Sequence, residues 1–405
     1  MRADSRIHWA LIAMFAATAC VEPPIVDDDT SSSGSETGLD SEDSDPEQSD
    51  SEESDTEAPE TEESETDERD TDEPDPCNPV VFEDPALEQR VRATLMLAED
   101  APIGPEQIAM LTDVFASNVG ITSLVGLECA TNLISVNVPN NQISDLSPIA
   151  DLPALERLEV ERNPLDTLPP LASVASLRSI SLHETAIADI SALAGATELE
   201  HLLLFETMIE DLEPLADSTK LIYLNASDTQ VEDLEFLLDF DALDTLLINN
   251  AQVSDLAPLT GLPALQRLEI SNNPILTLTP IATLPSLAWL SISSTGQPDL
   301  SDLTGLPIEW LDAADNGIVD VTPVTTFTPP EMAHLDLSNN LIDDLSPFLD
   351  TVWFGSGCGV QLLLEGNPVA ASPTFEEDHP YMCELEMFVI WNDAERLYCG
   401  ALPCP

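Results

Sequence analysis

Apolar residues recur through the middle of the chain at fixed offsets within a 22-residue unit. Eight leucines keep this spacing without a slip: Leu133, Leu155, Leu177, Leu199, Leu221, Leu243, Leu265 and Leu287. Further units of less regular length begin near Leu111, Ile308, Met332 and Gly359. A fixed period of this length is typical of a solenoid, because one unit cannot hide its apolar side until it stacks on its neighbours.

Each unit contains an apolar stretch such as Leu155, Leu158 and Val160, in which the last two positions alternate with polar residues. This alternation predicts a short strand with one face in the core and the other in solvent. The predicted fold class is therefore α/β, a leucine-rich-repeat solenoid over residues 111–369. Its curved parallel sheet forms the concave side, and short helical turns and loops form the convex side.

Two columns of polar residues follow each strand. The first should satisfy backbone groups left unpaired as the chain turns; it contains Asn141, Asn163, Asn273, Asn316, Asn340 and Asn367, with Thr185, Thr207, Thr229 and Thr295 elsewhere. The second should cap the convex turns, a metal-binding ladder being the alternative; it contains Asp145, Asp189, Asp211, Asp233, Asp255, Asp299, Asp320 and Asp344.

Residues 77–110 do not repeat and predict a helical N-terminal cap. Asp84 can cap a helix that starts at Pro85, with Leu87, Val91 and Leu95 on one buried face, and a second helix should begin near Pro105. Residues 370–405 are predicted to form a cysteine-containing C-terminal cap.

Residues 1–20 resemble a bacterial lipoprotein signal. Arg2 and Arg6 precede an apolar run that is too short to span a bilayer, and Cys20 would become the lipidated residue. Val21 rather than Asp follows this cysteine, which points to the outer membrane or cell surface; cleavage and secretion is the alternative. Residues 21–76 are dominated by Asp, Glu, Ser, Thr and Pro, which predicts a disordered acidic tether.

The chain holds 77 acidic against 11 basic residues, for a formal net charge of −66. This charge disfavours nucleic acid and anionic membranes, so we expect contact with a membrane only through the lipid. Basic partners are favoured, although the acidity can also serve solubility alone.

Six cysteines besides Cys20 are disulfide candidates, because export favours oxidation: Cys77, Cys129, Cys358, Cys383, Cys399 and Cys404. Cys77 with Cys129 is the preferred pair, since both flank the N-terminal cap. The four C-terminal cysteines leave three connectivities open. Zinc bound through His379, Cys383, Cys399 and Cys404 fits no compact ligand spacing, so no metal or cofactor is predicted.

The sequence predicts a binding protein rather than an enzyme, because no phosphate-binding loop or nucleophile elbow occurs. Binding candidates are aromatic and histidine side chains at solvent-facing positions of the concave sheet, where the core pattern does not require them. They are His201, Phe205, Tyr223, Trp289 and Trp310. Trp289 and Trp310 lie one strand apart and could stack on each other or on a sugar; scattered surface aromatics are the alternative interpretation.

Acidic residues are predicted on the same face: Glu156, Glu159, Glu161, Glu200, Glu206, Asp228, Asp312 and Asp315. They favour a basic partner over Ca²⁺ bridging. Arg157, Arg178 and Arg267 interrupt the acidic field and can form local ion pairs.

Several segments resemble the bacterial leucine-rich-repeat proteins of the internalin type. The resemblance is carried by residues 141–149, 335–347 and 120–128, and extends over about residues 82–369. It departs at Gln297, at Pro329 and over residues 355–359, and no wall-anchoring C-terminal motif is present. The resemblance implies a horseshoe that binds partners, often proteins, on its concave sheet. We expect a surface-displayed monomer that binds a protein or glycan ligand there. The alternative is an acidic structural or adhesion protein of the envelope that depends on Ca²⁺.

Overall fold

The computed structural model describes residues 77–171, 176–329, 332–350, 361–369, 388–392 and 395–397. The chain divides into two units, Met1–Asp70 and Thr71–Pro405, and all described residues lie in the second. The predicted signal segment and tether, and the cysteines Cys20, Cys358, Cys383, Cys399 and Cys404, lie outside the described residues.

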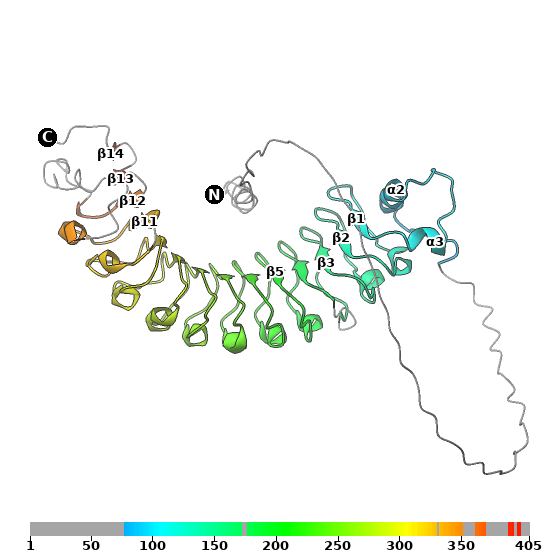
Figure 1. The fold of residues 1–405 in the computed structure, drawn as a ribbon. Coiled ribbons are helices and arrows are strands. Elements are labelled where there is room, and N and C mark those ends of the chain that lie inside the picture. The colour runs from blue at the N-terminus through cyan, green and yellow to red at the C-terminus, as the bar shows by residue number, and fades with distance from the viewer. Residues whose placement is uncertain are drawn as a thin grey trace, which may run out of the picture. The chain divides into compact units, whose positions relative to one another are not determined.

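One curved sheet runs along the second unit with its strands in chain order (Figure 1). Strands β1 to β13 are parallel to their neighbours, and β14 is antiparallel to β13. The strands are β1 Asp113–Phe115, β2 Ser135–Asn137, β3 Arg157–Glu159, β4 Ser179–Ser181, β5 His201–Leu203, β6 Tyr223–Asn225, β7 Thr245–Leu247, β8 Arg267–Glu269, β9 Trp289–Ser291, β10 Trp310–Asp312, β11 His334–Asp336, β12 Gln361–Leu363, β13 Phe388–Asn392 and β14 Glu395–Leu397.

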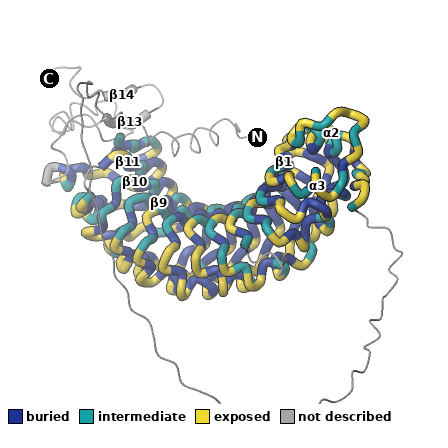
Figure 2. Tube along the Cα trace, turned by 45° about the vertical axis from the view of Figure 1, so that its right-hand side comes forward, coloured by how far each residue is buried: buried dark blue, intermediate teal, exposed yellow. Residues whose placement is uncertain are grey.

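The middle residue of each strand from β1 to β12 points into the core, as the alternating pattern predicts. Leu158, Leu202 and Leu290 have no exposed surface, and one continuous apolar cluster runs from Val80 to Val369. Buried residues fill the inner layer of the solenoid in Figure 2, with exposed residues at the turns. The solenoid predicted from the repeat is therefore confirmed.

Short 3₁₀ helices form the convex turns, opposite the strands in Figure 1. They span Leu127–Cys129, Ser147–Ile149, Ser191–Leu193, Glu213–Leu215, Glu235–Asp239, Ala257–Leu259, Thr279–Thr283, Ser301–Leu303, Val324–Thr326 and Ser346–Asp350. The Asp145 carboxylate accepts the Ser147 N–H at 2.8 Å, and the other seven aspartates of the column accept the equivalent N–H two residues ahead. The predicted capping role is confirmed.

The asparagine column joins successive repeats. Asn141 Oδ1 accepts the N–H groups of Gly120 at 2.9 Å and Ile121 at 3.0 Å in the preceding repeat, while Nδ2 donates to the Val138 carbonyl at 2.9 Å in its own. Asn163, Asn273, Asn316, Asn340 and Asn367 form the same kind of bridge. Each amide thus satisfies buried backbone groups on both sides of a repeat boundary.

The threonines of this column act differently. Thr185, Thr207 and Thr229 each donate to a carbonyl three residues earlier, at 2.6, 2.6 and 2.7 Å, so these bonds stay within one repeat. Ala251 occupies the next place in the column and is buried. Across four consecutive repeats the column therefore supplies no side-chain amide to bridge repeat boundaries.

Two features were not predicted. Gln297 takes an apolar place because its Nε2 donates to the Ile275 carbonyl at 2.6 Å in the preceding repeat. Each strand from β1 to β11 is also followed by a residue in the left-handed region, where φ lies between 53° and 59°: Asn118, Asn140, Arg162, Glu184, Glu206, Asp228, Asn250, Asn272, Ser294, Asp315 and Asn339. Glu206, Asp228 and Asp315, predicted on the concave face, lie in these turns at its edge.

The N-terminal cap contains α2 (Pro85–Thr94) and α3 (Pro105–Ile108). Asp84 caps α2 through the N–H groups of Ala86 and Leu87, and its second oxygen accepts the Thr122 N–H at 2.7 Å. Burial alone would raise the pKa of Asp84, but these hydrogen bonds lower it overall. The helix ends at Thr94, and Met96 just beyond its C-cap residue is left-handed.

A disulfide joins Cys77 to Cys129, with the two Cα atoms 5.6 Å apart. This bond ties the start of the cap to the first convex turn, Leu127–Cys129. The preferred N-terminal pairing is therefore confirmed.

Candidate functional site

Four side chains stack in register across the concave face of β8 to β11. The Trp289 and Trp310 rings lie 4.0 Å apart at 6°, and Trp310 and His334 lie 3.8 Å apart at 15°. Arg267 Cζ lies 4.4 Å from the centre of the Trp289 ring. We call Arg267, Trp289, Trp310 and His334 the aromatic ladder; parallel strands about 4.8 Å apart bring such side chains to stacking distance.

The two tryptophans stack on each other and on side chains of the flanking strands. Trp310 is covered on one face by Trp289 and on the other by His334, and Trp289 is covered by Trp310 and Arg267. Both tryptophans are half-buried. The part of each ring that still meets solvent is its edge, because its faces are occupied.

A second stack lies nearer the N-terminus. His183 and Phe205, which follow β4 and β5, have ring centres 4.1 Å apart, and Ser181 Oγ lies 2.9 Å from His183 Nδ1. His201 on β5 is exposed, whereas Tyr223 on β6 is half-buried and burial raises its pKa. Of the five predicted residues, only His201 is exposed, and the other four are half-buried.

Sequence reasoning missed three members of these stacks, His183, Arg267 and His334. The 22-residue spacing already placed His183 one repeat before Phe205 and Arg267 one repeat before Trp289. His334 follows Trp310 by a longer interval, and their pairing shows only in the strand register.

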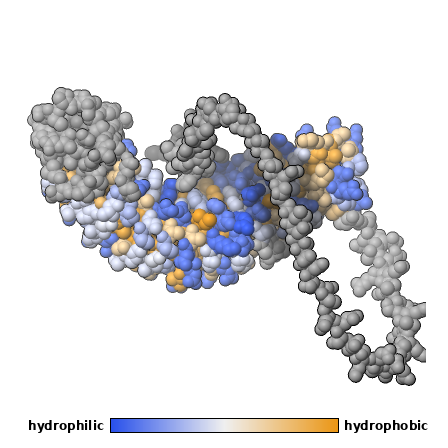
Figure 3. Space-filling view, viewed as in Figure 1, coloured by the Kyte–Doolittle hydropathy of each residue, from blue (hydrophilic) through white to orange (hydrophobic). Residues whose placement is uncertain are grey.

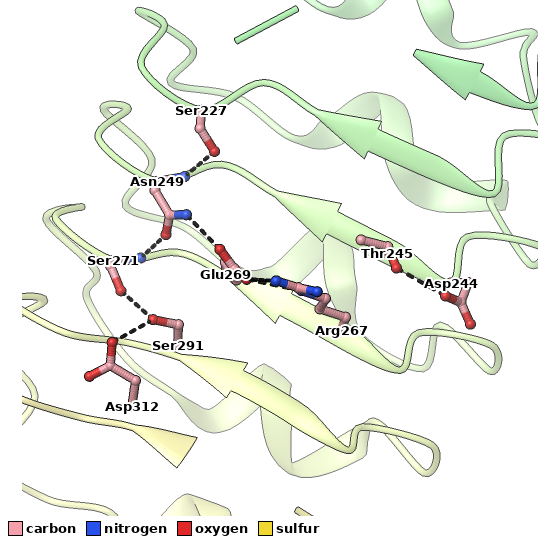
Figure 4. Close-up of polar contacts among 9 residues, drawn as sticks. All are labelled: Ser227, Asp244, Thr245, Asn249, Arg267, Glu269, Ser271, Ser291 and Asp312. Atoms are coloured by element: carbon pink, nitrogen blue, oxygen red, sulfur yellow. Dashed lines mark hydrogen bonds and ion pairs between the residues drawn. The ribbon is translucent and has the colours of Figure 1, made fainter. Parts of the chain in front are cut away.

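A chain of polar contacts holds Arg267 in the ladder (Figure 4). Glu269 accepts Arg267 Nε at 2.9 Å and Asn249 Nδ2 at 2.9 Å. Asn249 is itself held by Ser227 and Ser271 at 3.1 and 2.8 Å. The guanidinium therefore reaches Trp289 from a fixed position.

The same figure shows a second chain of polar contacts that continues to β10. Ser271 Oγ lies 2.7 Å from Ser291 Oγ, which donates to Asp312 Oδ2 at 3.1 Å. Ser293 Oγ also donates to Asp312. These hydroxyls fix the Asp312 carboxylate beside the ladder.

We call β4 to β7 the middle segment, and the basic residues beside its first strands are paired with acids. Arg178 contacts Glu200 at 2.5 Å and Glu198 at 3.7 Å, and Lys220 contacts Glu198 at 2.5 Å. Arg162 pairs with Glu184 across the same repeats. The basic residues of this region thus offset acids of neighbouring repeats.

Just before this segment, Glu159 on β3 is half-buried. Burial and the neighbouring Glu161 raise the pKa of Glu159, and Arg157 partly opposes this.

In the ladder region, the described residues form one such pair, between Arg267 and Glu269 on β8. No Lys or Arg occurs between Arg267 and Arg396. Glu309, Asp312 and Asp336 take part in none of the ion pairs among the described residues. Asp312 and Asp336 are opposite each other in the β10–β11 register, two residues along from Trp310 and His334. The ladder is therefore flanked by carboxylates without a cationic neighbour of their own, apart from the Arg267 at its end.

Other surfaces are less informative. In Figure 3, apolar colour is concentrated over the N-terminal cap, where Val81, Met96 and Met110 are 67, 93 and 72% exposed. No helix within the described ranges has the length and apolar character needed to cross a membrane. That part of the chain also contains no group of three or more His, Cys, Asp or Glu placed to hold a metal.

Comparisons with known proteins point to one group. The family model described as Leucine Rich repeats (2 copies) matches residues 131–173. An internalin of Listeria monocytogenes, InlF, is 27% identical with a TM-score of 0.68, over 77% of this chain and 90% of that one. No curated protein matches.

Two further solved structures bear on the family and the fold. Internalin C2 of Listeria monocytogenes is 31% identical with a TM-score of 0.52, over 53% of this chain and 97% of that one. A leucine-rich-repeat protein of Leptospira interrogans, 15% identical with a TM-score of 0.55 over 70% of this chain and 79% of that one, shares the fold. The chain belongs to the internalin family of leucine-rich-repeat proteins.

Proposed function

We propose that this protein is a surface-displayed recognition module that binds a protein partner on its concave sheet. The observation that carries the proposal is the aromatic ladder, because the core does not require aromatic rings at these outward positions. Tryptophan and arginine are enriched among the residues that dominate binding energy in interfaces. The proposal assigns no catalytic step to the chain.

The stacked arrangement itself favours binding. Trp289, Trp310 and His334 hold one another in place, and Glu269 holds Arg267. Ordering a free side chain at an interface costs about 0.5–1.5 kcal/mol, so residues ordered in advance lose less on association. The ladder is thus a prepared contact surface.

Display at the surface is the second part of the proposal. Cys20 would carry the lipid that anchors the protein to the bacterial outer membrane or cell surface, and residues 21–76 would act as an acidic spacer. We propose that the protein works as a monomer; release as a secreted protein is the alternative. Mass spectrometry of the exported protein tests the anchor, since an unmodified Cys20 would contradict it.

Capture from the organism's own surface extract tests the binding function. The bait is the chain from Val21 onward, with a Trp289→Ala/Trp310→Ala double variant and Phe115→Ala as the matched control. Phe115 is also an outward aromatic of this sheet and is 62% exposed. The double variant should lose at least about tenfold in capture while the control keeps it and far-UV dichroism is unchanged. Undiminished capture by the double variant would remove the ladder from the proposal.

Two alternatives can be separated from this proposal. A glycan would normally stack on an open ring face, and the faces of Trp289 and Trp310 are covered, so a glycan is less favoured at the ladder. An acidic envelope protein that depends on Ca²⁺ is suggested by the unpaired carboxylates of β10 and β11. Calorimetry with Ca²⁺ addresses that function, because absence of binding heat and of a melting shift counts against it.

A further inference from the structure

We infer that the partner docks on the ladder through a segment that combines apolar with basic side chains, lying across β8 to β11. The inference rests on the proposed function and adds the chemistry of the partner and the part of the sheet that it contacts. It follows from which surfaces of the ladder are open and from the charges beside them.

The open surface of the ladder is a ridge of ring edges. Four groups on consecutive strands, about 4.8 Å apart, form a ridge about 14 Å long that crosses the strands. An extended polypeptide rises about 3.4 Å per residue, so roughly four residues cover the ridge. Apolar or aromatic side chains fit such edges, since edge-to-face contact is a preferred aromatic geometry.

The charges beside the ridge select for cations. Asp312 and Asp336 lie on one side of Trp310 and His334, and Glu309 precedes Trp310 on the other. Like charges directly opposite each other on neighbouring strands are destabilising. An ammonium or guanidinium group from a partner would offset this repulsion, and Asp312 is already held in place by Ser291 and Ser293.

The middle segment lacks this combination. Its stack of His183 and Phe205 lies among acids that pair with Arg162, Arg178 and Lys220. A basic partner would have to displace those internal cations. The chain's own acidic stretch, residues 27–75, has the wrong charge to occupy the ladder.

Peptide probes test the inference on the chain from Val21 onward. The first probe is a fluorescein-labelled peptide of alternating Phe and Arg. Two control peptides carry Glu in place of Arg or Ser in place of Phe, and a β-linked N-acetylglucosamine oligomer is the glycan probe. We expect the Phe–Arg peptide to bind at least about tenfold more tightly than any other probe.

Charge-matched variants locate the binding. Asp312→Asn/Asp336→Asn should weaken binding of the Phe–Arg peptide about tenfold. Asp211→Asn/Asp233→Asn removes the same charge from convex turns and should leave binding unchanged. The inference would be overturned if both pairs of Asp variants weakened peptide binding equally, or if the Ser control peptide bound as tightly as the Phe–Arg peptide. Oligosaccharide binding that depends on Trp310 would also overturn it.

Capture from the surface extract separates this inference from the proposed function. If the double tryptophan variant loses capture while Asp312→Asn/Asp336→Asn retains it, the binding function holds and the basic partner is wrong. If neither variant changes capture, the proposed function fails as well. Loss of capture in both variants, together with the peptide preference, supports both.

Discussion

The middle segment and the ladder half of the sheet, β8 to β11, share one backbone plan but differ in how their repeats are joined and charged. Each carries a histidine stacked on an aromatic ring. In the ladder half, Asn273, Asn316 and Asn340 bridge to the preceding repeat, and Thr295 is the one column residue without an amide. In the middle segment the corresponding residues are Thr185, Thr207, Thr229 and Ala251. The repeat core therefore fixes the fold, while the turn positions decide which repeats are joined by amides and the outward positions decide which carboxylates lack an ion pair.

The largest expected effect comes from removing a bridging amide. Asn316 is 5% exposed and bonds to Thr295, Gln297, Ile292 and Ala313. Asn316→Ala leaves these backbone groups without their hydrogen-bond partner. It should lower the free energy of unfolding by about 3 kcal/mol. Thr207→Ala loses one bond within a repeat and should cost about 1 kcal/mol. Urea unfolding of both variants measures the difference. Equal losses of unfolding free energy would contradict the difference in how the two regions join their repeats.

Single aromatic substitutions should separate the two stacks in binding. Trp310→Ala removes the ring between Trp289 and His334. It should weaken binding of the captured partner by about 2 kcal/mol, or roughly 30-fold in affinity. Phe205→Ala removes the ring stacked on His183 in the middle segment and should change affinity by less than about threefold. Isothermal titration with the captured partner measures both, and a larger loss in Phe205→Ala would move the binding site to the middle segment.

The middle segment should become stiffer when it receives an amide. Thr207→Asn would reach back toward the Ile187 N–H of the preceding repeat, as Asn163 does to Ile143. We expect a gain of about 1 kcal/mol in unfolding free energy and slower hydrogen exchange at Ile187. Asn163→Thr is the reverse control and should speed exchange at Ile143. Unchanged exchange in both would show that the amide is not what distinguishes the repeats.

The smallest expected difference lies on the convex side, where the two regions use the same cap. Hydrogen bonds from Ser191 and Ser301 lower the pKa values of Asp189 and Asp299. A carboxylate with a depressed folded pKa stabilises the fold above its unfolded pKa, and this contribution is lost as pH falls through the folded pKa. NMR titration should give both groups midpoints below that of an unperturbed Asp. A depressed midpoint in only one of them would mean that the turns differ as well.

Much of the fold was predictable because the same pattern of apolar and polar positions recurs in every repeat. The 22-residue spacing, the polar columns and the Pro85 helix start each follow from local chemistry that recurs or is self-contained. The proposed binding face was less predictable. Trp310 pairs with His334 across a longer repeat, so a fixed spacing does not bring them together. The left-handed turns at Arg162 and Glu184 could not be predicted from residue preference either. The surrounding fold imposes a backbone conformation that those residues disfavour.

Hydrogen exchange of the chain from Val21 onward, with and without the captured partner, tests most directly whether the ladder half is the binding face. Slower exchange should appear in residues 289–291, 310–312 and 334–336, with residues 179–183 and 201–205 unchanged. Protection confined to the middle segment or to the convex turns would contradict the binding face described here.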